Sequence, residues 1–344
     1  MTKSIDRSAE EIWLASYLYY AEPWEEFLIH AVRPLVDKVI NTGLASQYFF
    51  IRYWEKGPHI RLRFKGDAET LEAEVRPLIV EHFNAYYAQK PSQRQEPVWD
   101  DSIADEHRWY PNNSVQFITY EPETDRYGGD QAITVAERQF QASSKATFEI
   151  IADGLDSWDY NRALGAAIQL HLGFAYGVGM DQEEAKQFFS QVFKNWLPRA
   201  YYFFEPDISQ DELAKRRDET LKAFEANFEN QKTGLIQFLQ SVWEAFQAGE
   251  TFDQQWINNW VDDMKQVKSD LVVLQKVGQI TAPKFYMENI EADVAFEKKQ
   301  LWSIYDSYIH MINNRLGIMN RDEGYLAYLM RESIKAISNI VENE

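Results

Sequence analysis

The sequence contains no cysteine, and this absence excludes several kinds of chemistry. Without thiols the chain can form no disulfide, no thiolate metal site and no cysteine nucleophile. A chain without cysteine also suits a reducing compartment. No stretch reaches the ~18 consecutive apolar residues of a membrane helix, and the first residues lack the apolar core of a signal peptide. We therefore expect a soluble, cytoplasmic protein without a membrane span.

Basic side chains are also scarce, because 35 Lys and Arg stand against 54 Asp and Glu and the formal net charge is −19. Nucleic-acid binding needs a basic surface that neutralises phosphates, so we expect no direct nucleic-acid partner. The common metal, nucleotide and nucleophile-elbow motifs are missing as well, and we expect no metal and no cofactor. Aromatic residues are instead abundant, with 11 Trp, 19 Tyr and 21 Phe, and they predict a bulky core.

Hydrophobic periodicity predicts an α+β fold. Residues 1–120 alternate between strand and helix patterns, which predicts a small N-terminal antiparallel or mixed sheet with helices. Residues 121–344 have helical spacing almost throughout, and this mostly helical part should pack on the sheet. No linker separates the two parts, so we expect a single domain over residues 1–344. The expected elements are strands at 11–20 and 115–120, a hairpin at 49–64, and helices at 24–41, 68–88, 130–151, 159–175, 182–198, 209–247, 253–279, 285–317 and 321–342.

The most informative stretch is the hairpin itself, FFIRYWEKGPHIRLRF. Two runs in which apolar and polar residues alternate flank a Gly-Pro turn, a pattern typical of paired strands. In the second run His59, Arg61 and Arg63 fall on one face of the strand, because successive side chains point to opposite sides. The two arginines stand roughly 6.5–7 Å apart by strand rise, a spacing that suits a grip on one carboxylate-bearing group. A solvated basic face is the alternative interpretation.

Two further stretches hold candidate residues. In YEPETDRYGG, Arg126 lies at a predicted strand-to-helix junction, followed by two glycines that permit unusual dihedrals. A surface ion pair is the alternative for this arginine. In LWSIYDSYIHMINNRLG, His310 lies on a polar stripe one turn after Asp306, which could hold the imidazole in one tautomer, and Asn314 follows one turn later. A solvated histidine is the alternative for this stripe.

These three stretches, in this order and near these spacings, resemble the C-terminal elimination domain of lantibiotic dehydratases. The same domain also occurs as a free-standing protein in thiopeptide-type biosynthesis. The resemblance covers essentially the whole chain, and the family's larger glutamylating domain is expected to be absent. Asp125 replaces a glutamate that many relatives have before RYGG, and Asn313 stands where relatives vary.

The resemblance implies that the protein removes glutamate from a glutamylated Ser or Thr of a precursor peptide, leaving dehydroalanine or dehydrobutyrine. Arginines would hold the glutamyl group and stabilise the departing charge, and a histidine would act as general base. The implied catalytic residues are His310, Arg61, Arg63 and Arg126. The implied substrate-binding residues are Arg61, Arg63, Arg126, His59 and Asn314.

The implied partners are the glutamylated precursor peptide and a separate, tRNA-dependent dehydratase subunit that glutamylates it; a homodimer is left open. Two other functions also stay open. Some relatives join two dehydroalanines into a pyridine ring in thiopeptides, although those relatives tend to lose the arginine and RYGG motifs. Alternatively, the chain is a non-catalytic scaffold that binds a precursor peptide or a partner dehydratase, with a peptide strand added at a sheet edge.

Overall fold

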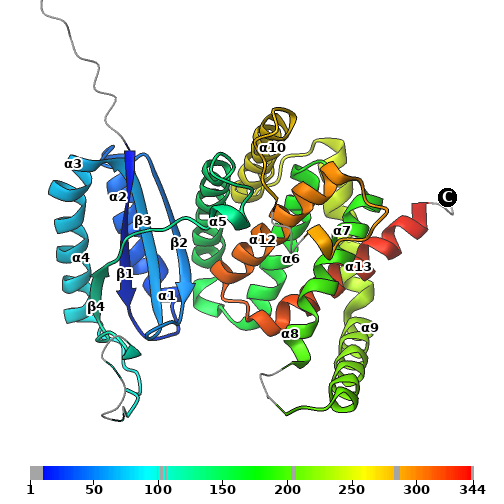
Figure 1. The fold of residues 1–344 in the computed structure, drawn as a ribbon, viewed down its shortest axis with the longest axis horizontal. Helices are drawn as coiled ribbons and strands as arrows, with labels where there is room; N and C mark the ends of the chain where they lie inside the picture. The colour runs from blue at the N-terminus through cyan, green and yellow to red at the C-terminus, as the bar shows by residue number, and fades with distance from the viewer. Residues whose placement is uncertain are drawn as a thin grey trace, which may run out of the picture. The chain divides into compact units, whose positions relative to one another are not determined.

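The computed structural model describes residues 11–98, 100, 104, 107–202, 207–282 and 287–341, without the side chains of 339–341. The chain divides into two compact units, each with its own architecture (Figure 1). The sheet unit comprises residues 1–122 and 151–158, and the helical unit comprises residues 123–150 and 159–344. A single domain over the whole chain stays a prediction.

In its described residues, the sheet unit contains four strands and two interrupted helices. Both helices were expected, and each contains a π-helical turn that ends just before an Arg-Pro pair. Proline has no backbone N–H to donate, so the regular hydrogen-bond ladder is disturbed at these points. The bounds are β1 Glu11–Tyr19, α1 Glu25–Phe27, η1 Leu28–Val32, α2 Arg33–Asn41, β2 Gln47–Tyr53, β3 His59–Asp67, α3 Ala68–Thr70, η2 Leu71–Val75, α4 Arg76–Gln89 and β4 Ser114–Phe117.

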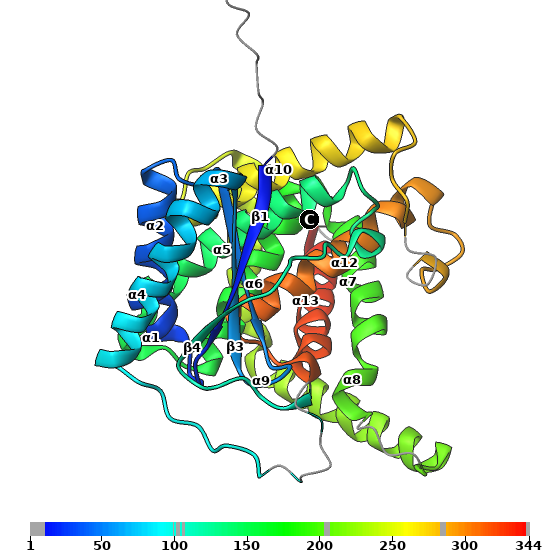
Figure 2. The same cartoon turned by 60° about the vertical axis from the view of Figure 1, so that its left-hand side comes forward.

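The strands form one antiparallel sheet in the order β2-β3-β1-β4. Together with the helices after β1 and β3, this is the βαββαβ arrangement of ferredoxin-like folds. Helices α2 and α4 lie on the same side of the sheet (Figure 1; Figure 2). The fold-class prediction of a small N-terminal antiparallel sheet is thus confirmed. The expected fourth strand is shorter than predicted, since β4 pairs with β1 only as far as Phe117.

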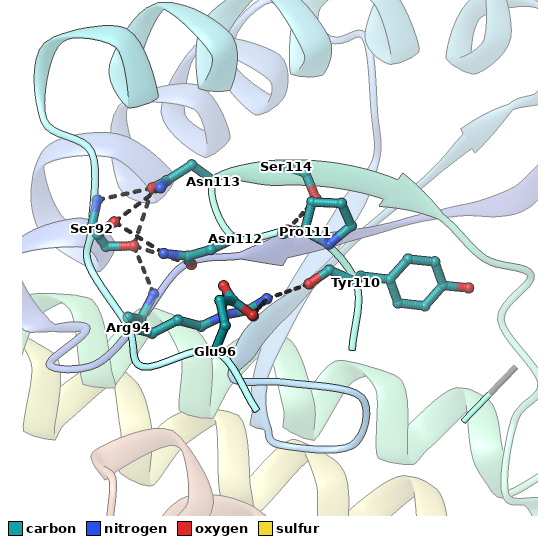
Figure 3. Close-up of polar contacts among 9 residues, drawn as sticks. Ser92, Arg94, Glu96, Tyr110, Pro111, Asn112, Asn113 and Ser114 are labelled. Carbon is teal, nitrogen blue, oxygen red and sulfur yellow. Dashed lines mark hydrogen bonds and ion pairs between the residues drawn. The ribbon is translucent and has the colours of Figure 1, made fainter. Parts of the chain in front are cut away.

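The long loop after α4 is closed by hydrogen bonds between its two legs (Figure 3). The Ser92 amide donates to Asn113 Oδ1 at 2.9 Å, and Asn113 Nδ2 donates back to the Ser92 carbonyl at 2.9 Å. Arg94 donates to the carbonyl of Tyr110 on the other leg. A Cβ on Gly57, at φ +106°, would lie 2.7 Å from Arg94 Nη1, so the hairpin turn requires glycine where the loop approaches it.

The helical unit contains the helices that periodicity predicted, with two differences. The helix expected at 285–317 is interrupted: residues 287–288 are helical, turns follow them, and α12 begins at Phe296. Residues 285–286 lie outside the described residues. The helix expected at 182–198 ends at Trp196, and Pro198 opens a separate short helix. The bounds are η4 Thr124–Arg126, α5 Ile133–Gly154, η5 Leu155–Ser157, α6 Tyr160–Gly177, α7 Gln182–Trp196, α8 Pro198–Tyr201, α9 Gln210–Ala248, α10 Gln255–Lys276, α12 Phe296–Leu316 and α13 Asn320–Val341. The last residues of α5 and all of η5 belong to the sheet unit.

Helix α12 carries part of the candidate site and is largely buried, with 13 of its 21 residues in the interior. It packs against α6 and α13, and α13 in turn packs against α7, α8 and α9. Its end at Gly317 is a Schellman-type cap, with φ +81° at the glycine and the Ile318 amide donating to the Asn313 carbonyl at 2.9 Å. Arg315 is fully buried there and donates to Ser144 Oγ at 3.0 Å. The last residues of the motif HMINNRLG therefore stabilise the end of α12 and its packing.

Among the described residues, no helix combines the length and the apolar character needed to cross a membrane.

Candidate functional site

The first cluster of candidate residues lies on the sheet face opposite α2 and α4. Strand alternation buries Ile60 and Leu62 on the helix-covered face and places His59, Arg61 and Arg63 together on the other. Pairing with β1 sets aromatic or small residues opposite the three: Tyr19, Tyr17 and Ala15, in that order. The predicted grouping of these three residues on one strand face is confirmed.

A hydrogen bond joins Arg61 to His59, and a second one fixes His59 to the backbone of Gly57. Burial lowers the pKa of His59 to about 4, so the imidazole is neutral near pH 7. Its Nδ1 lies 2.8 Å from the Gly57 carbonyl and donates to it, and Arg61 Nε donates to Nε2 at 3.1 Å. The Arg61 guanidinium lies over the rings of Tyr17 and Tyr53, at 4.5 and 3.5 Å from their centroids. The neutral histidine and the rings hold Arg61 in place. Its Nη2 also donates to Oε2 of the exposed Glu55 at 3.3 Å, so Arg61 carries a solvent-exposed ion pair.

Arg63 is the buried cation of this cluster. Its side chain lies between Phe49 and Tyr120, with the guanidinium carbon 5.0 and 4.2 Å from the ring centroids, and only 7% of the residue is exposed. Burial lowers the pKa of Arg63, although an arginine keeps its proton in proteins. Within the described part of the chain, its Nε has no hydrogen-bond partner and no carboxylate pairs with it. A buried charge left uncompensated in this way favours the binding of an anion.

The second cluster lies in the helical unit and contains Arg126. This residue ends the short turn η4, where its Nη1 lies 3.5 Å from Glu123 Oε2 and its Nε donates to Ser307 Oγ of α12 at 3.2 Å. The two glycines behind it have φ of +95° and +96°, as their position in the motif predicted. A Cβ on Gly128 would lie 2.7 Å from Ile304 Cδ1. The double glycine thus lets the turn approach α12 closely and brings Arg126 to it.

His310 also lies on α12, one turn after the serine that binds Arg126. Its Nδ1 lies 2.8 Å from Glu323 Oε1 of α13, and Trp196 of α7 stacks on its ring at 4.7 Å between centroids. The expectation that Asp306 holds the imidazole is wrong, because Asp306 Oδ1 instead accepts a hydrogen bond from Trp196 Nε1 at 3.1 Å. Burial raises the pKa of Asp306 to about 7, against the lowering effect of the Trp196 hydrogen bond.

The polar stripe around His310 faces the interior. Ser303, Asp306 and Ser307 are buried, and the His310 side chain is 16% exposed. A solvated histidine, the alternative drawn from the sequence, does not fit this burial. Asn314 lies one turn further along α12 and is half-buried.

The structure thus groups the predicted residues into two clusters in different units: His59, Arg61 and Arg63 in the sheet unit, and Arg126 and His310 in the helical unit. That all of them serve one reaction stays a prediction. Sequence reasoning missed Glu323 and Trp196, which come from other helices than His310 and carry no motif. In the described part of the chain, no three His, Asp or Glu side chains gather as a metal site would require.

Comparison with known proteins places this geometry in a family. Residues 13–334 match the family model described as lantibiotic biosynthesis dehydratase C-term. The subtilin biosynthesis protein SpaB of Bacillus subtilis is 30% identical over 135 residues, which are 39% of this chain. The aligned part is only 11% of SpaB, so the chain matches a small share of that relative.

Solved structures share the fold at low sequence identity. The pyridine synthase TbtD from thiomuracin biosynthesis is 18% identical with a TM-score of 0.71, over 95% of this chain and 99% of that one. The tRNA-dependent lantibiotic dehydratase MibB from Microbispora sp. 107891 is 18% identical with a TM-score of 0.60, over 98% of this chain and 29% of MibB.

The family model covers nearly the whole chain and both clusters of candidate residues. The fold likeness to TbtD and MibB agrees with it. The chain therefore belongs to the lantibiotic biosynthesis dehydratase C-terminal family, whose members modify ribosomally made peptides.

Proposed function

We propose that this protein eliminates glutamate from glutamylated Ser or Thr side chains of a precursor peptide, as a lyase. The partners in this proposal are the glutamylated peptide and a separate subunit that glutamylates it. The observation that carries the proposal is the buried guanidinium of Arg63, which no described carboxylate neutralises, next to Arg61 on the same strand face. Such a pair is suited to an anionic side-chain substituent such as a glutamyl ester.

The reaction needs one base and a means to stabilise a departing carboxylate. His310 Nε2 takes the Cα proton, the freed electron pair forms the Cα=Cβ bond, and the bond from Cβ to the ester oxygen breaks. Glutamate then leaves as a carboxylate, which Arg61, Arg63 and Arg126 stabilise. His59 orients Arg61 through its 3.1 Å hydrogen bond, and Asn314 contacts the peptide. No cofactor takes part in this sequence of steps.

The test is to incubate the protein with a peptide that carries a glutamylated serine and to follow its mass. Loss of the mass of glutamic acid, with formation of dehydroalanine, is the expected result. His310→Ala should bind the glutamylated peptide and leave it unreacted, whereas Arg63→Met should weaken both binding and turnover. Arg76→Met is the matched control, because Arg76 lies on α4 in an exposed ion pair with Glu72.

Two outcomes would contradict the proposal. Elimination by His310→Ala at the wild-type rate would show that the base is another residue. Tight binding of the glutamylated peptide without any change of mass, by the wild-type protein, would favour a non-catalytic scaffold for the precursor peptide or its dehydratase.

A pyridine-forming cycloaddition is the second candidate, favoured by the likeness to TbtD, whose TM-score of 0.71 exceeds the 0.60 for MibB. This reaction would join two dehydroalanines of one peptide and release its leader segment. A peptide that already carries both dehydroalanines separates the two candidates, since an eliminating enzyme leaves its mass unchanged. A ring-closed product with a released leader would replace the elimination proposal.

A further inference from the structure

A continuous line of polar side chains runs behind His310 into the interior of the helical unit. Glu323 Oε1 lies 2.8 Å from His310 Nδ1, and Asn313 Nδ2 donates to Glu323 Oε2 at 3.0 Å. Asn313 Oδ1 in turn lies 2.9 Å from Nε2 of His171 on α6. The Glu323 side chain is 1% exposed, and Asn313 and His171 are buried as well. Three helices, α6, α12 and α13, thus contribute to one hydrogen-bonded line.

The direction of each hydrogen bond follows from the chemistry of the groups. A carboxylate only accepts, so the Asn313 amide must turn its NH₂ to Glu323 and its oxygen to His171. His171 Nε2 must then carry a hydrogen. Burial lowers the pKa of His171 to about 4, so this imidazole is neutral and its Nδ1 has no hydrogen. That Nδ1 is buried and has no hydrogen-bond partner in the described part of the chain, which leaves His171 a pure donor to Asn313.

Glu323 consequently receives two donors, one at each oxygen. Neither a lysine nor an arginine from the described residues pairs with it, and His310 is the group that can balance its charge. Asp306, one turn before His310, is a further titratable group on α12: the charge of Glu323 raises its pKa, and the charge of Arg126 lowers it. Trp196 stacks on the imidazole with an angle of 21° between the planes and fixes the tilt of the ring.

We propose that Glu323 is the positioning residue of His310, and that Asn313 and His171 hold Glu323 for this task. Glu323 accepts the hydrogen of His310 Nδ1, so the neutral imidazole keeps its lone pair at Nε2, the nitrogen that has to act as base. When Nε2 gains a proton, the carboxylate balances the new charge. The catalytic half of this inference rests on the proposed function, but the assignment of the tautomer does not.

The tautomer can be measured directly by nitrogen-15 NMR on protein labelled in its six histidines. A spectrum of His310→Gln identifies the signals of His310. In the wild-type protein, at a pH where His310 is neutral, we expect the hydrogen at Nδ1. Glu323→Gln offers one acceptor oxygen to two donors, so His310 should shift toward the form with hydrogen at Nε2. Glu332→Gln is the matched control on the same helix and should leave the signals in place, because Glu332 pairs with Arg331.

Activity supplies the second measurement. With glutamylated peptide, Glu323→Gln should lower kcat by about 10²-fold with little change in KM, the scale expected when a reacting group is misplaced. Glu323→Asp should restore part of the rate, because it keeps the carboxylate.

The tautomer measurement and the activity measurement test different parts of the inference. A wild-type His310 with its hydrogen at Nε2, or a tautomer that does not respond to Glu323→Gln, overturns the inference whatever the activity. The wild-type spectrum alone decides this if Glu323→Gln does not fold. A tautomer that shifts as expected while elimination is unchanged supports the positioning of His310 by Glu323 and overturns instead the role of His310 as base.

Discussion

Three arginines are buried among the described residues, and their partners differ. Arg52 pairs with Glu25 at 2.8 Å on the helix-covered face of the sheet. Arg315 donates to Ser144 Oγ and to the Met311 carbonyl, and so ties α12 to α5 and to its own preceding turn. Arg63 has aromatic rings around it and no described carboxylate beside it. Burial alone therefore does not indicate that an arginine is functional. A buried arginine without a carboxylate partner is the better indication.

The unbalanced charge of Arg63 should cost stability in the free protein. Arg63→Met removes the charge and keeps an apolar stem, so we expect the free energy of unfolding to rise by about 1–3 kcal/mol while binding and turnover of the glutamylated peptide weaken. Urea denaturation and the glutamylated-peptide assay measure the two effects. Arg52→Met is the control, and should destabilise the protein because it leaves Glu25 unpaired. A clear loss of stability in Arg63→Met would mean that the guanidinium has a stabilising partner.

Asp306 should make stability depend on pH. Burial raises its pKa from 3.8 to about 7, so between roughly pH 4 and 7 the folded protein holds a proton that the unfolded chain has released. The protonated Asp306 therefore contributes to the free energy of unfolding in full below about pH 4. The contribution decreases by up to about 1.4 kcal/mol per pH unit as pH rises, and it is lost as pH passes through 7.

Asp306→Asn removes the titration and keeps an acceptor for the Trp196 indole. The stability of the wild-type protein minus that of the variant should fall from about pH 4 to 7 and become flat above. Thermal or urea unfolding over this range measures the difference. Parallel curves for the two proteins would contradict a raised pKa at Asp306.

At the scale of elements, alternation and helical spacing predicted most of the architecture, because burial on one face imposes these periods directly. The hairpin of β2 and β3 shows this, since alternation alone put Arg61 and Arg63 on one face. The π-helical turns and the late start of α12 were not predicted, because they depend on local hydrogen bonding that leaves no period. Nor was Glu323 found: it contacts His310 from the next helix, whereas the sequence offered Asp306 on the same helix.

The turn before α5 should tolerate no side chain at Gly128. At φ +95° an alanine is strained, and its Cβ would lie 2.7 Å from Ile304 Cδ1. We expect Gly128→Ala to lower the free energy of unfolding by about 1–3 kcal/mol and to reduce turnover, because Arg126 would move. Gly165→Ala is the control: this glycine lies inside α6 with no atom within 4 Å of the added Cβ. It should stabilise the protein by about 0.5–1 kcal/mol. Equal effects of the two changes on thermal unfolding would refute the steric account.

At the scale of the whole molecule, the net charge of −19 governs the response to salt. Many like charges repel one another in the folded state, and ions screen this repulsion over about 10 Å at 0.1 M. We expect Tm to rise as sodium chloride increases from low concentration to about 0.15 M, and to rise equally with potassium chloride. A Tm that falls with both salts would mean that the surface ion pairs outweigh the repulsion.

The division of the chain also has a consequence for its synthesis. The sheet unit takes its last segment from residues 151–158, after the chain has already entered the helical unit at residue 123. A ribosome therefore releases strands β1 to β4 before the sheet unit has its full set of residues. The segments of the sheet unit are complete only when Trp158 has left the exit tunnel, with the first part of α5 already made. Folding during translation should accordingly proceed in overlapping stages, in which α5 emerges before either unit is whole.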